Sequence, residues 1–169
     1  MILPIVKYGT AGLQRPAVPV DEITPELQAL FDNMIETMYA ASGIGLAAPQ
    51  VDVALRIFVI DLSIGRRADD VIVFVNPEFV EREGMQLEEE GCLSLPGFTA
   101  TVARPQRAVV RGLDRHGVER TIEGEGLLAR AFQHEMDHLD GTLFVDRLRG
   151  IKRDLIVRRI NKLARAGEW

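Results

Sequence analysis

The stretch Gln133–His138, with the letters QHEMDH, constrains the fold more than any other part of this sequence. Residues four apart lie one above the other on the same face of an α-helix. His134 and His138 can therefore each present a ring nitrogen to one metal ion, and Glu135 can reach a water bound to that ion. The stretch predicts a helix that carries two ligands and a general base for metal-assisted hydrolysis.

The only cysteine of the chain, Cys92, is the candidate for a third ligand. A single cysteine excludes an intramolecular disulfide, and taken alone it is more often a small buried apolar residue than a ligand. Two histidines, however, need a third ligand to hold a catalytic metal, and a thiolate suits that role. Cys92, His134 and His138 predict a site with three protein ligands and a fourth position open for water.

The length and composition are those of a single globular domain that spans residues 1–169. The net charge of −5 argues against a general nucleic-acid binder. The sequence lacks the run of about 18 apolar residues that a membrane-spanning helix needs, and its first residues lack the pattern of a signal peptide. We therefore expect a cytoplasmic monomer that contacts neither a membrane nor DNA.

The distribution of apolar residues predicts an α+β fold. Thr24 is a candidate N-cap ahead of Pro25, and apolar residues at helical spacing predict a first helix that ends before Gly43. Residues rich in β-branched and aromatic side chains predict strands at 55–62, 71–75, 79–80, 99–102, 108–113 and 118–122. Further helices are expected at about 126–139 and from about 150. We expect antiparallel β-sheets packed around a central metal-binding helix, with an N-terminal and a C-terminal helix.

Three other polar residues call for separate interpretations. His116 occupies a predicted turn without a partner motif, and we expect it to be exposed and uninvolved. Arg130 lies one turn before His134 and belongs either to the rim of a pocket or, as we favour, to the solvated surface. Glu90 precedes the Cys92 motif, and we expect a buried arginine as its partner.

A third segment, Gly43–Gln50 with the letters GIGLAAPQ, is by itself a glycine-rich turn. Together with Glu90–Ser94 (EGCLS) and Gln133–Gly141 (QHEMDHLDG) it resembles the peptide deformylases. That family carries the motifs G-φ-G-φ-A-A-x-Q, E-G-C-φ-S and Q-H-E-x-D-H-φ-x-G in this order. All three motifs match at their defining positions, and the resemblance covers nearly the whole chain.

The resemblance implies a hydrolase that removes the formyl group from N-formylmethionyl nascent peptides and releases formate. It implies that Cys92, His134 and His138 bind the metal. Glu135 would take a proton from water and give it to the departing amine. The oxyanion would be held by the backbone N–H of Leu93 and the side-chain amide of Gln50.

The substrate peptide would contact two groups of residues. The resemblance implies that Gly45 approaches the formyl group, and that Ile44 and Gly91 pair with the peptide as if it added a strand. Helical spacing places Leu127 and Ala131 on the face of His134. We predict that these two side chains form the wall of the methionine pocket, and plain core packing is the alternative.

The identity of the metal follows from two different arguments. A four-coordinate site with nitrogen and sulfur ligands suggests Zn²⁺ by geometry. The resemblance implies one Fe²⁺ per chain as the native ion, with Zn²⁺, Ni²⁺ or Co²⁺ able to replace it. We favour Fe²⁺ because of the resemblance.

Two rival functions deserve comparison. A zinc peptidase of the metzincin type needs a third histidine where this chain has Phe144, which cannot bind a metal; Asp146 remains a formal candidate ligand. This rival leaves Cys92 without a role. A metal-stabilised binding module is the second rival, and a three-ligand site with an adjacent carboxylate argues against it.

The segment from Arg147 to Arg165 carries eight basic residues and the single acid Asp154. A solvated helix face is the simplest interpretation of such a pattern. The resemblance suggests a second interpretation, a contact between this C-terminal helix and ribosomal RNA, which would weaken as salt rises.

Overall fold

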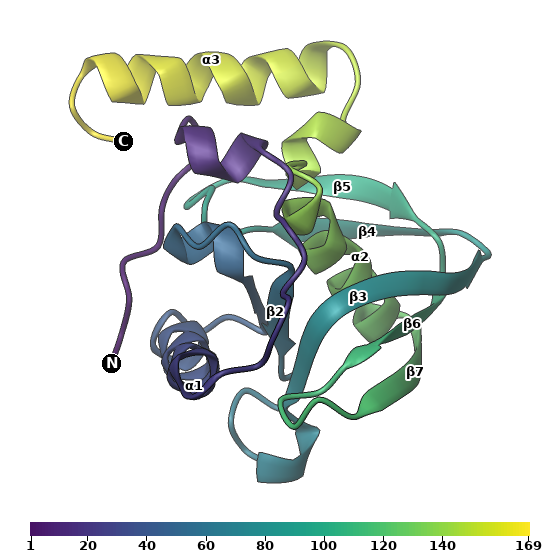
Figure 1. Cartoon of the computed structure of the whole chain (residues 1–169). Helices are drawn as coiled ribbons and strands as arrows, with labels where there is room; N and C mark the ends of the chain where they lie inside the picture. Colours follow the sequence, from purple (N-terminus) through teal and green to yellow (C-terminus); the bar gives the residue numbers. More distant parts are fainter.

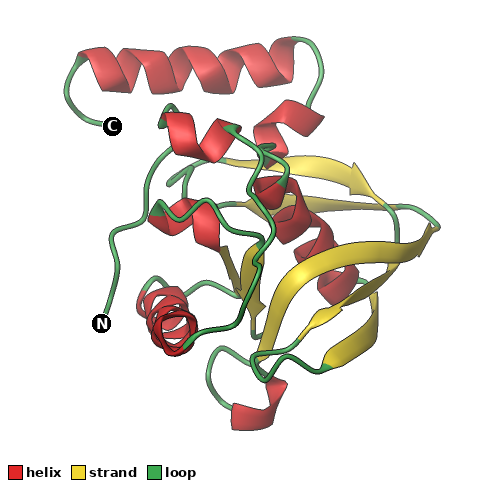
Figure 2. Ribbon diagram, viewed as in Figure 1, coloured by secondary structure: helices red, strands yellow, loops and turns green.

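In the computed structural model, which describes residues 1–169, three α-helices and seven strands alternate with short 3₁₀ helices (Figures 1 and 2). The α-helices are α1 (Pro25–Ala40), α2 (Leu127–Leu139) and α3 (Ile151–Arg165). The strands are β1 (Gly45–Ala47), β2 (Ile57–Ile60), β3 (Ile72–Glu83), β4 (Gln86–Gly91), β5 (Thr99–Arg104), β6 (Arg107–Leu113) and β7 (Glu119–Glu125). The 3₁₀ helices are η1 (Ala11–Gln14), η2 (Ala48–Val51), η3 (Ala68–Asp70) and η4 (Phe144–Arg147).

The strands form two antiparallel sheets on either side of α2 (Figure 1). The larger sheet has the order β1-β2-β3-β6-β7, and β4 pairs only with β5. The predicted α+β architecture, with antiparallel sheets around a central helix and a further helix near each end of the chain, is confirmed. None of the helices combines the length and the apolar content that crossing a membrane would require.

The larger sheet is covered by a helix on each face. Phe58 of β2 belongs to a buried cluster with Phe132 of α2, whereas its neighbour Val59 belongs to a cluster with Met34 of α1. Successive strand residues point to opposite faces. All four residues of β2 are therefore buried, which explains why this segment is continuously apolar in the sequence.

The structure corrects one prediction about the strands. Segments 71–75 and 79–80 are parts of one long strand, β3, rather than two strands. The interruption in the apolar pattern is an irregularity in the pairing with β6, between Val75 and Glu78. Asn76 adopts a left-handed backbone there, with φ of 52°. A bulge of this kind also accommodates Pro77 without ending the strand.

The helices begin and end where local signals predict. Thr24 caps α1 by accepting a hydrogen bond from the backbone N–H of Leu27 at 3.3 Å. The chain leaves α2 at Gly141, whose φ is 78°. A Cβ atom at this position would lie 2.9 Å from the backbone of Gln14, so glycine permits both the turn and the approach of the N-terminal arm.

The C-terminal part of the chain packs on a third group of buried apolar residues, which we call the C-terminal cluster. Its members are Leu13, Leu95, Val102, Leu143, Phe144, Val145, Leu148 and Ile160. Cys92, Phe98 and Trp169 are partly buried against it. The cluster thus connects α3 with the segment that follows β4.

Candidate metal centre and active site

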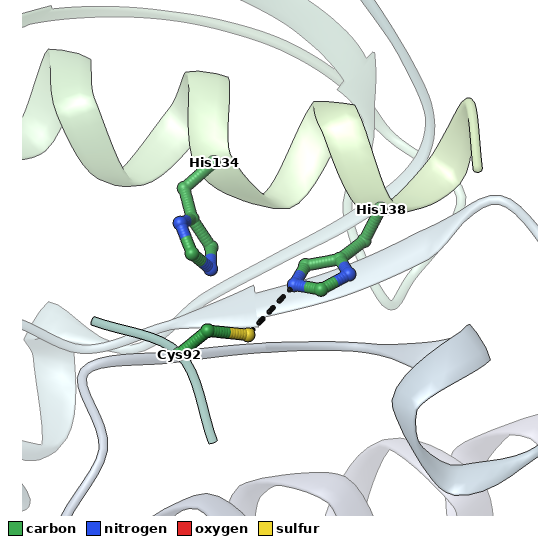
Figure 3. A group of neighbouring side chains, drawn as sticks. All are labelled: Cys92, His134 and His138. Carbon is green, nitrogen blue, oxygen red and sulfur yellow. Dashed lines mark hydrogen bonds between the residues drawn. The ribbon is translucent and has the colours of Figure 1, made fainter. Parts of the chain in front are cut away.

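Cys92, His134 and His138 come together between the end of β4 and the middle of α2 (Figure 3). One possible ligand atom from each residue lies within 4.8 Å of the other two. Sγ of Cys92 is 3.3 Å from Nε2 of His138. Sulfur and nitrogen ligands form bonds of about 2.0–2.3 Å to an ion such as zinc. The ligand atoms of one ion therefore lie close to one another, as these three atoms do. The donor set and its spacing therefore fit one metal ion with sulfur and nitrogen ligands.

His134 is oriented by a carboxylate behind it. Its Nδ1 lies 2.6 Å from Oε1 of Glu90, so Nδ1–H donates to the carboxylate and Nε2 is left with its lone pair toward Cys92. Such a carboxylate behind a metal-binding histidine fixes the ring and its tautomer. Burial opposes charge on His138 and lowers its pKa well below the usual value. A neutral ring is the form that binds a metal.

Glu90 is held in turn by two buried arginines. Arg104 donates to both oxygens of its carboxylate, at 2.6 and 2.8 Å, and Arg130 also donates to Oε2. Burial raises the pKa of Glu90, but the hydrogen bonds from Arg104 and His134 outweigh burial and the pKa is lowered. Glu90 is thus ionised, and the expected buried arginine partner is present twice. Arg104 also donates to Asp137 of α2 at 3.0 Å.

The favoured interpretation of Arg130 as a solvated surface charge is wrong. Arg130 is 4% exposed. Besides Glu90, it donates to Oε1 of Gln86 at 3.0 Å and to the carbonyl of Val102 at 2.8 Å. The signal in the sequence was its spacing of four from His134, which places it on the inward face of α2. Arg104 and Gln86 carry no such signal, because they reach the site from β5 and β4.

Glu135 lies in the same buried region, and its Oε1 has no hydrogen-bond partner within the chain. Burial penalises the carboxylate and raises the pKa of Glu135 to about 7. A group with a pKa near neutrality can both accept and donate a proton at physiological pH. An orphaned buried oxygen of this kind indicates a position where a further polar group binds.

Gln50 and Leu93 contribute N–H groups to this region. Gln50 is fixed through Oε1, which accepts from the backbone of Ala47 at 3.0 Å. Its Nε2 donates to Oγ of Ser94 at 3.1 Å and lies 3.7 Å from Sγ of Cys92. The backbone N–H of Leu93 forms no hydrogen bond within the chain. The N–H groups of Gln50 and Leu93 thus lie near the possible metal ligands, and that of Leu93 is without a partner.

A cavity of about 520 Å³ opens onto these groups. Its lining includes the predicted substrate-contacting residues Ile44, Gly45, Gly91, Leu127 and Ala131, together with Cys92, His134 and Glu135. Leu127 is 54% exposed, at the mouth, whereas Ala131 is 4% exposed. Both side chains therefore border the cavity, on the same helix as His134.

Strands β1 and β4 border the cavity from opposite sides. Gly45 belongs to β1 and Gly91 to β4. Each strand has a single neighbour, β2 and β5 respectively. Their other edges carry main-chain groups that no strand of this chain pairs with.

Asp146, the candidate ligand of the peptidase rival, and His116 both lie outside this group. Oδ2 of Asp146 accepts a hydrogen bond from the backbone of Leu143 at 3.0 Å, and Asp146 is absent from the ligand group. His116 is exposed in the turn before β7, as predicted. Cys92 therefore takes the position that a peptidase would give to a downstream acid or histidine.

Comparison with known proteins agrees with this geometry. A model of the family described as polypeptide deformylase matches residues 2–154. A peptide deformylase of Acidobacterium capsulatum is 55% identical over 100% of this chain and 99% of its own. The crystal structure of a peptide deformylase from Legionella pneumophila is 44% identical, with a TM-score of 0.92 over 99% of this chain and 98% of that one. The peptide deformylase structure from Thermus thermophilus gives 42% identity and a TM-score of 0.87, over 95% of this chain and 94% of that one.

Proposed function

The chain belongs to the polypeptide deformylases, metal-dependent enzymes that remove the N-formyl group from nascent peptides, and we propose that it hydrolyses the formyl amide of N-terminal formylmethionine with Glu135 as the general base. The observation that carries this proposal is the position of Glu135. Its carboxylate is buried beside the ligand group, has an unpartnered oxygen and has a pKa of about 7.

The metal would be held by Cys92, His134 and His138, whose donor atoms are already gathered. A divalent ion held there supplies Lewis acidity, which acidifies water and polarises a carbonyl. We propose Fe²⁺ as the native ion, with Zn²⁺, Ni²⁺ or Co²⁺ as possible replacements. The mixed sulfur and nitrogen donors are compatible with each of these ions, and metal analysis of anaerobically purified protein decides among them.

In this proposal, Glu135 carries out both proton transfers. Its carboxylate takes a proton from the attacking water as the oxygen forms a bond to the formyl carbon. The carbon–nitrogen bond then breaks, and Glu135 gives the proton to the departing amine. Formate and the free N-terminal methionine are the products, and the carboxylate is regenerated.

The charge on the formyl oxygen would be stabilised by Gln50 and Leu93. The NH₂ group of Gln50 donates to Oγ of Ser94 and to Sγ of Cys92, so the N–H that faces the sulfur would turn to the formyl oxygen. The backbone N–H of Leu93 has no partner in the chain. Each such donor is worth roughly 3–4 kcal/mol in a transition state of this kind.

The peptide would lie as an extended strand between β1 and β4. Ile44, directly before β1, and Gly91, at the end of β4, both line the cavity, and Gly45 leaves space next to Glu135. Main-chain hydrogen bonds to both edges would hold the peptide. The methionine side chain would enter the cavity beside Leu127 and Ala131, which offer an apolar surface.

Formate release from formyl-Met-Ala-Ser by the metal-loaded protein tests this proposal. Glu135→Gln should abolish turnover while the metal content stays the same, because Glu135 is not a ligand. The exposed Glu22→Gln variant is the matched control and should retain full activity. A fully metallated, folded protein that releases no formate would contradict the proposal.

We also propose that α3 contacts ribosomal RNA. Lys152, Arg158, Arg159, Lys162 and Arg165 are exposed on α3, and none of them has an acidic partner. Phosphate contacts by such residues would make binding fall steeply with salt. Reversing Arg158, Arg159 and Lys162 to Glu should abolish co-sedimentation with ribosomes at low salt. Binding that survives this change would contradict the contact.

A cytoplasmic location and a monomeric state stay predictions.

A further inference from the structure

Trp169 packs against a wall of the active-site cavity from outside. The chain turns back after α3 toward the N-terminal arm (Figure 1). There the indole meets the ring of Phe98 edge-on, with centroids 5.9 Å apart and an interplanar angle of 66°. Phe98 lines the cavity, whereas Trp169 does not. Phe98 therefore connects the indole with the space that would receive the peptide.

A second contact joins Trp169 to the same segment through the N-terminal arm. Nε1 of Trp169 donates to the carbonyl of Tyr8 at 2.8 Å. The backbone N–H of Tyr8 donates to the carbonyl of Ser94 at 2.9 Å. Ser94 lies two residues after Cys92. The indole thus contacts the segment after Cys92 both through a ring and through a chain of hydrogen bonds.

The segment Cys92–Phe98 is held at its start by Ser94, whose Oγ accepts from Gln50 at 3.1 Å, and is more open after Leu95. Two turn bonds shape it, from the N–H of Leu95 to the carbonyl of Cys92 and from the N–H of Phe98 to the carbonyl of Leu95, at 2.9 and 3.2 Å. Pro96 and Gly97 are exposed, and Gly97 has a left-handed φ of 85°. Phe98 also packs against the C-terminal cluster, and the indole of Trp169 adds an aromatic contact to its ring.

We propose that Trp169 is a positioning residue for substrate binding, because it holds Phe98 and the segment after Cys92 against the cavity. The family match ends at residue 154, so Trp169 lies outside the part of the chain that the family model describes. That the ligand is a formyl-Met peptide rests on the proposed function. The support that Trp169 gives to the segment Cys92–Phe98 does not depend on it.

The first test separates binding from chemistry. Trp169→Ala should raise KM for formyl-Met-Ala-Ser roughly three- to tenfold, which is the range for the loss of an aromatic pair. The value of kcat should change by less than about twofold, because Phe98 would contact the substrate equally in the ground state and in the transition state. Trp169→Phe should restore most of the loss, since a ring remains to pack on Phe98. Ile151→Ala, an apolar truncation at the exposed start of α3, is the matched control.

A double-mutant cycle assigns the effect to Phe98. If Trp169 acts through this ring, adding Trp169→Ala to Phe98→Ala should raise KM no further than Phe98→Ala alone. Trp169 is the only tryptophan, so its emission gives a direct signal. Formyl-Met-Ala-Ser added to the metal-loaded Glu135→Gln variant should change that emission, and Phe98→Ala should remove the change.

Amide exchange provides a measurement that needs neither metal nor turnover. Trp169→Ala should accelerate exchange at Leu95 and Phe98, whereas Ile151→Ala should not. Unchanged exchange at these two amides overturns the inference. So does an unchanged KM in Trp169→Ala when the unmodified chain releases formate. If the unmodified chain releases none, the proposed function fails and the exchange comparison still decides the role of Trp169.

Discussion

A Cβ atom on Gly45 would lie 2.5 Å from Oε2 of Glu135. Strand β1 and helix α2 therefore approach each other as closely as the carboxylate allows, and only glycine leaves it in place. Gly45, the second glycine of the GIGLAAPQ segment, thus leaves room for the proposed general base as well as for a substrate.

Gly45→Ala should consequently displace Glu135 and lower kcat/KM for formyl-Met peptides on the order of a hundredfold, as small misplacements of reacting groups do. Metal content, measured in the same samples, should stay unchanged. Gly43→Ala is the comparison, because its Cβ would meet only the flexible end of Leu93, at 2.8 Å. Equal losses in the two variants would argue against a specific effect on Glu135.

Arg130→Met should destabilise the protein by about 3–5 kcal/mol, because it leaves buried Glu90 with one guanidinium in place of two. Metal affinity, measured by competition with a chelator, should fall as well, since Glu90 orients His134. Arg111→Met is the matched control. Arg111 pairs with Glu78 on the exposed face of the sheet, so its loss should change the free energy of unfolding little.

Ala131→Leu should raise KM for formyl-Met-Ala-Ser about tenfold, because the larger side chain fills part of the proposed methionine pocket. A substrate with formyl-Ala at its first position should be affected less. Ala29→Leu, an exposed change of the same size on α1, controls for the substitution itself. An unchanged KM in Ala131→Leu would place the methionine pocket elsewhere.

Ile64→Asn should stabilise the protein by about 1 kcal/mol, the cost of a left-handed backbone at a β-branched residue. Ile64 and Gly65 have φ of 56° and 81°, and the N–H of Arg66 donates to the carbonyl of Ser63 at 3.2 Å. Asparagine is favoured at the first central position of such a turn. Thermal unfolding should shift upward by about 2–4 °C. Ile64→Val, which is also β-branched, should show no gain.

Asp61 should contribute to the loss of stability in acid. Burial raises its pKa, but hydrogen bonds from Ser63, Tyr39 and Gly65 outweigh burial and the pKa is lowered. A depressed pKa in the folded state stabilises above the unfolded value of about 3.9, and this contribution is lost as pH falls through the folded value. Denaturant unfolding of the metal-free protein should therefore weaken below about pH 4.

Asp61→Asn should make that acid decline shallower. Asp69→Asn, at an exposed carboxylate without a hydrogen-bond partner, should leave the decline unchanged. An identical acid decline in Asp61→Asn and the unmodified chain would show that Asp61 does not contribute to it.

The parts of this protein that could be predicted from sequence are those fixed by neighbours along the chain. Helical spacing was sufficient to place His134, His138 and the cavity-lining Ala131 on one face of α2. The burial of Arg130 follows from the same spacing, yet a charged residue outside any motif suggests the surface. Its partner Glu90 comes from strand β4 of the smaller sheet, so the pairing depends on how β4 and β5 pack on α2.

Other features were unpredictable for the same reason. The continuity of β3 through Pro77 depends on a bulge that β6 permits, and no local pattern distinguishes this from a loop. The contact between Trp169 and Phe98 joins residues far apart in sequence through the C-terminal cluster. Arg104 is one of many arginines in the sequence, and only its position on β5 opposite α2 gives it two buried carboxylate partners.

The open edges of β1 and β4 bear on how many different proteins one such enzyme could serve. Hydrogen bonds to main-chain atoms are the same for every amino acid except proline. A peptide bound through its main chain, with only its first side chain in a pocket, would be selected by its N-terminal residue and not by the rest of its sequence. A single enzyme of this design could therefore act on newly made proteins of many different sequences, and a cell would not need a separate enzyme for each of them.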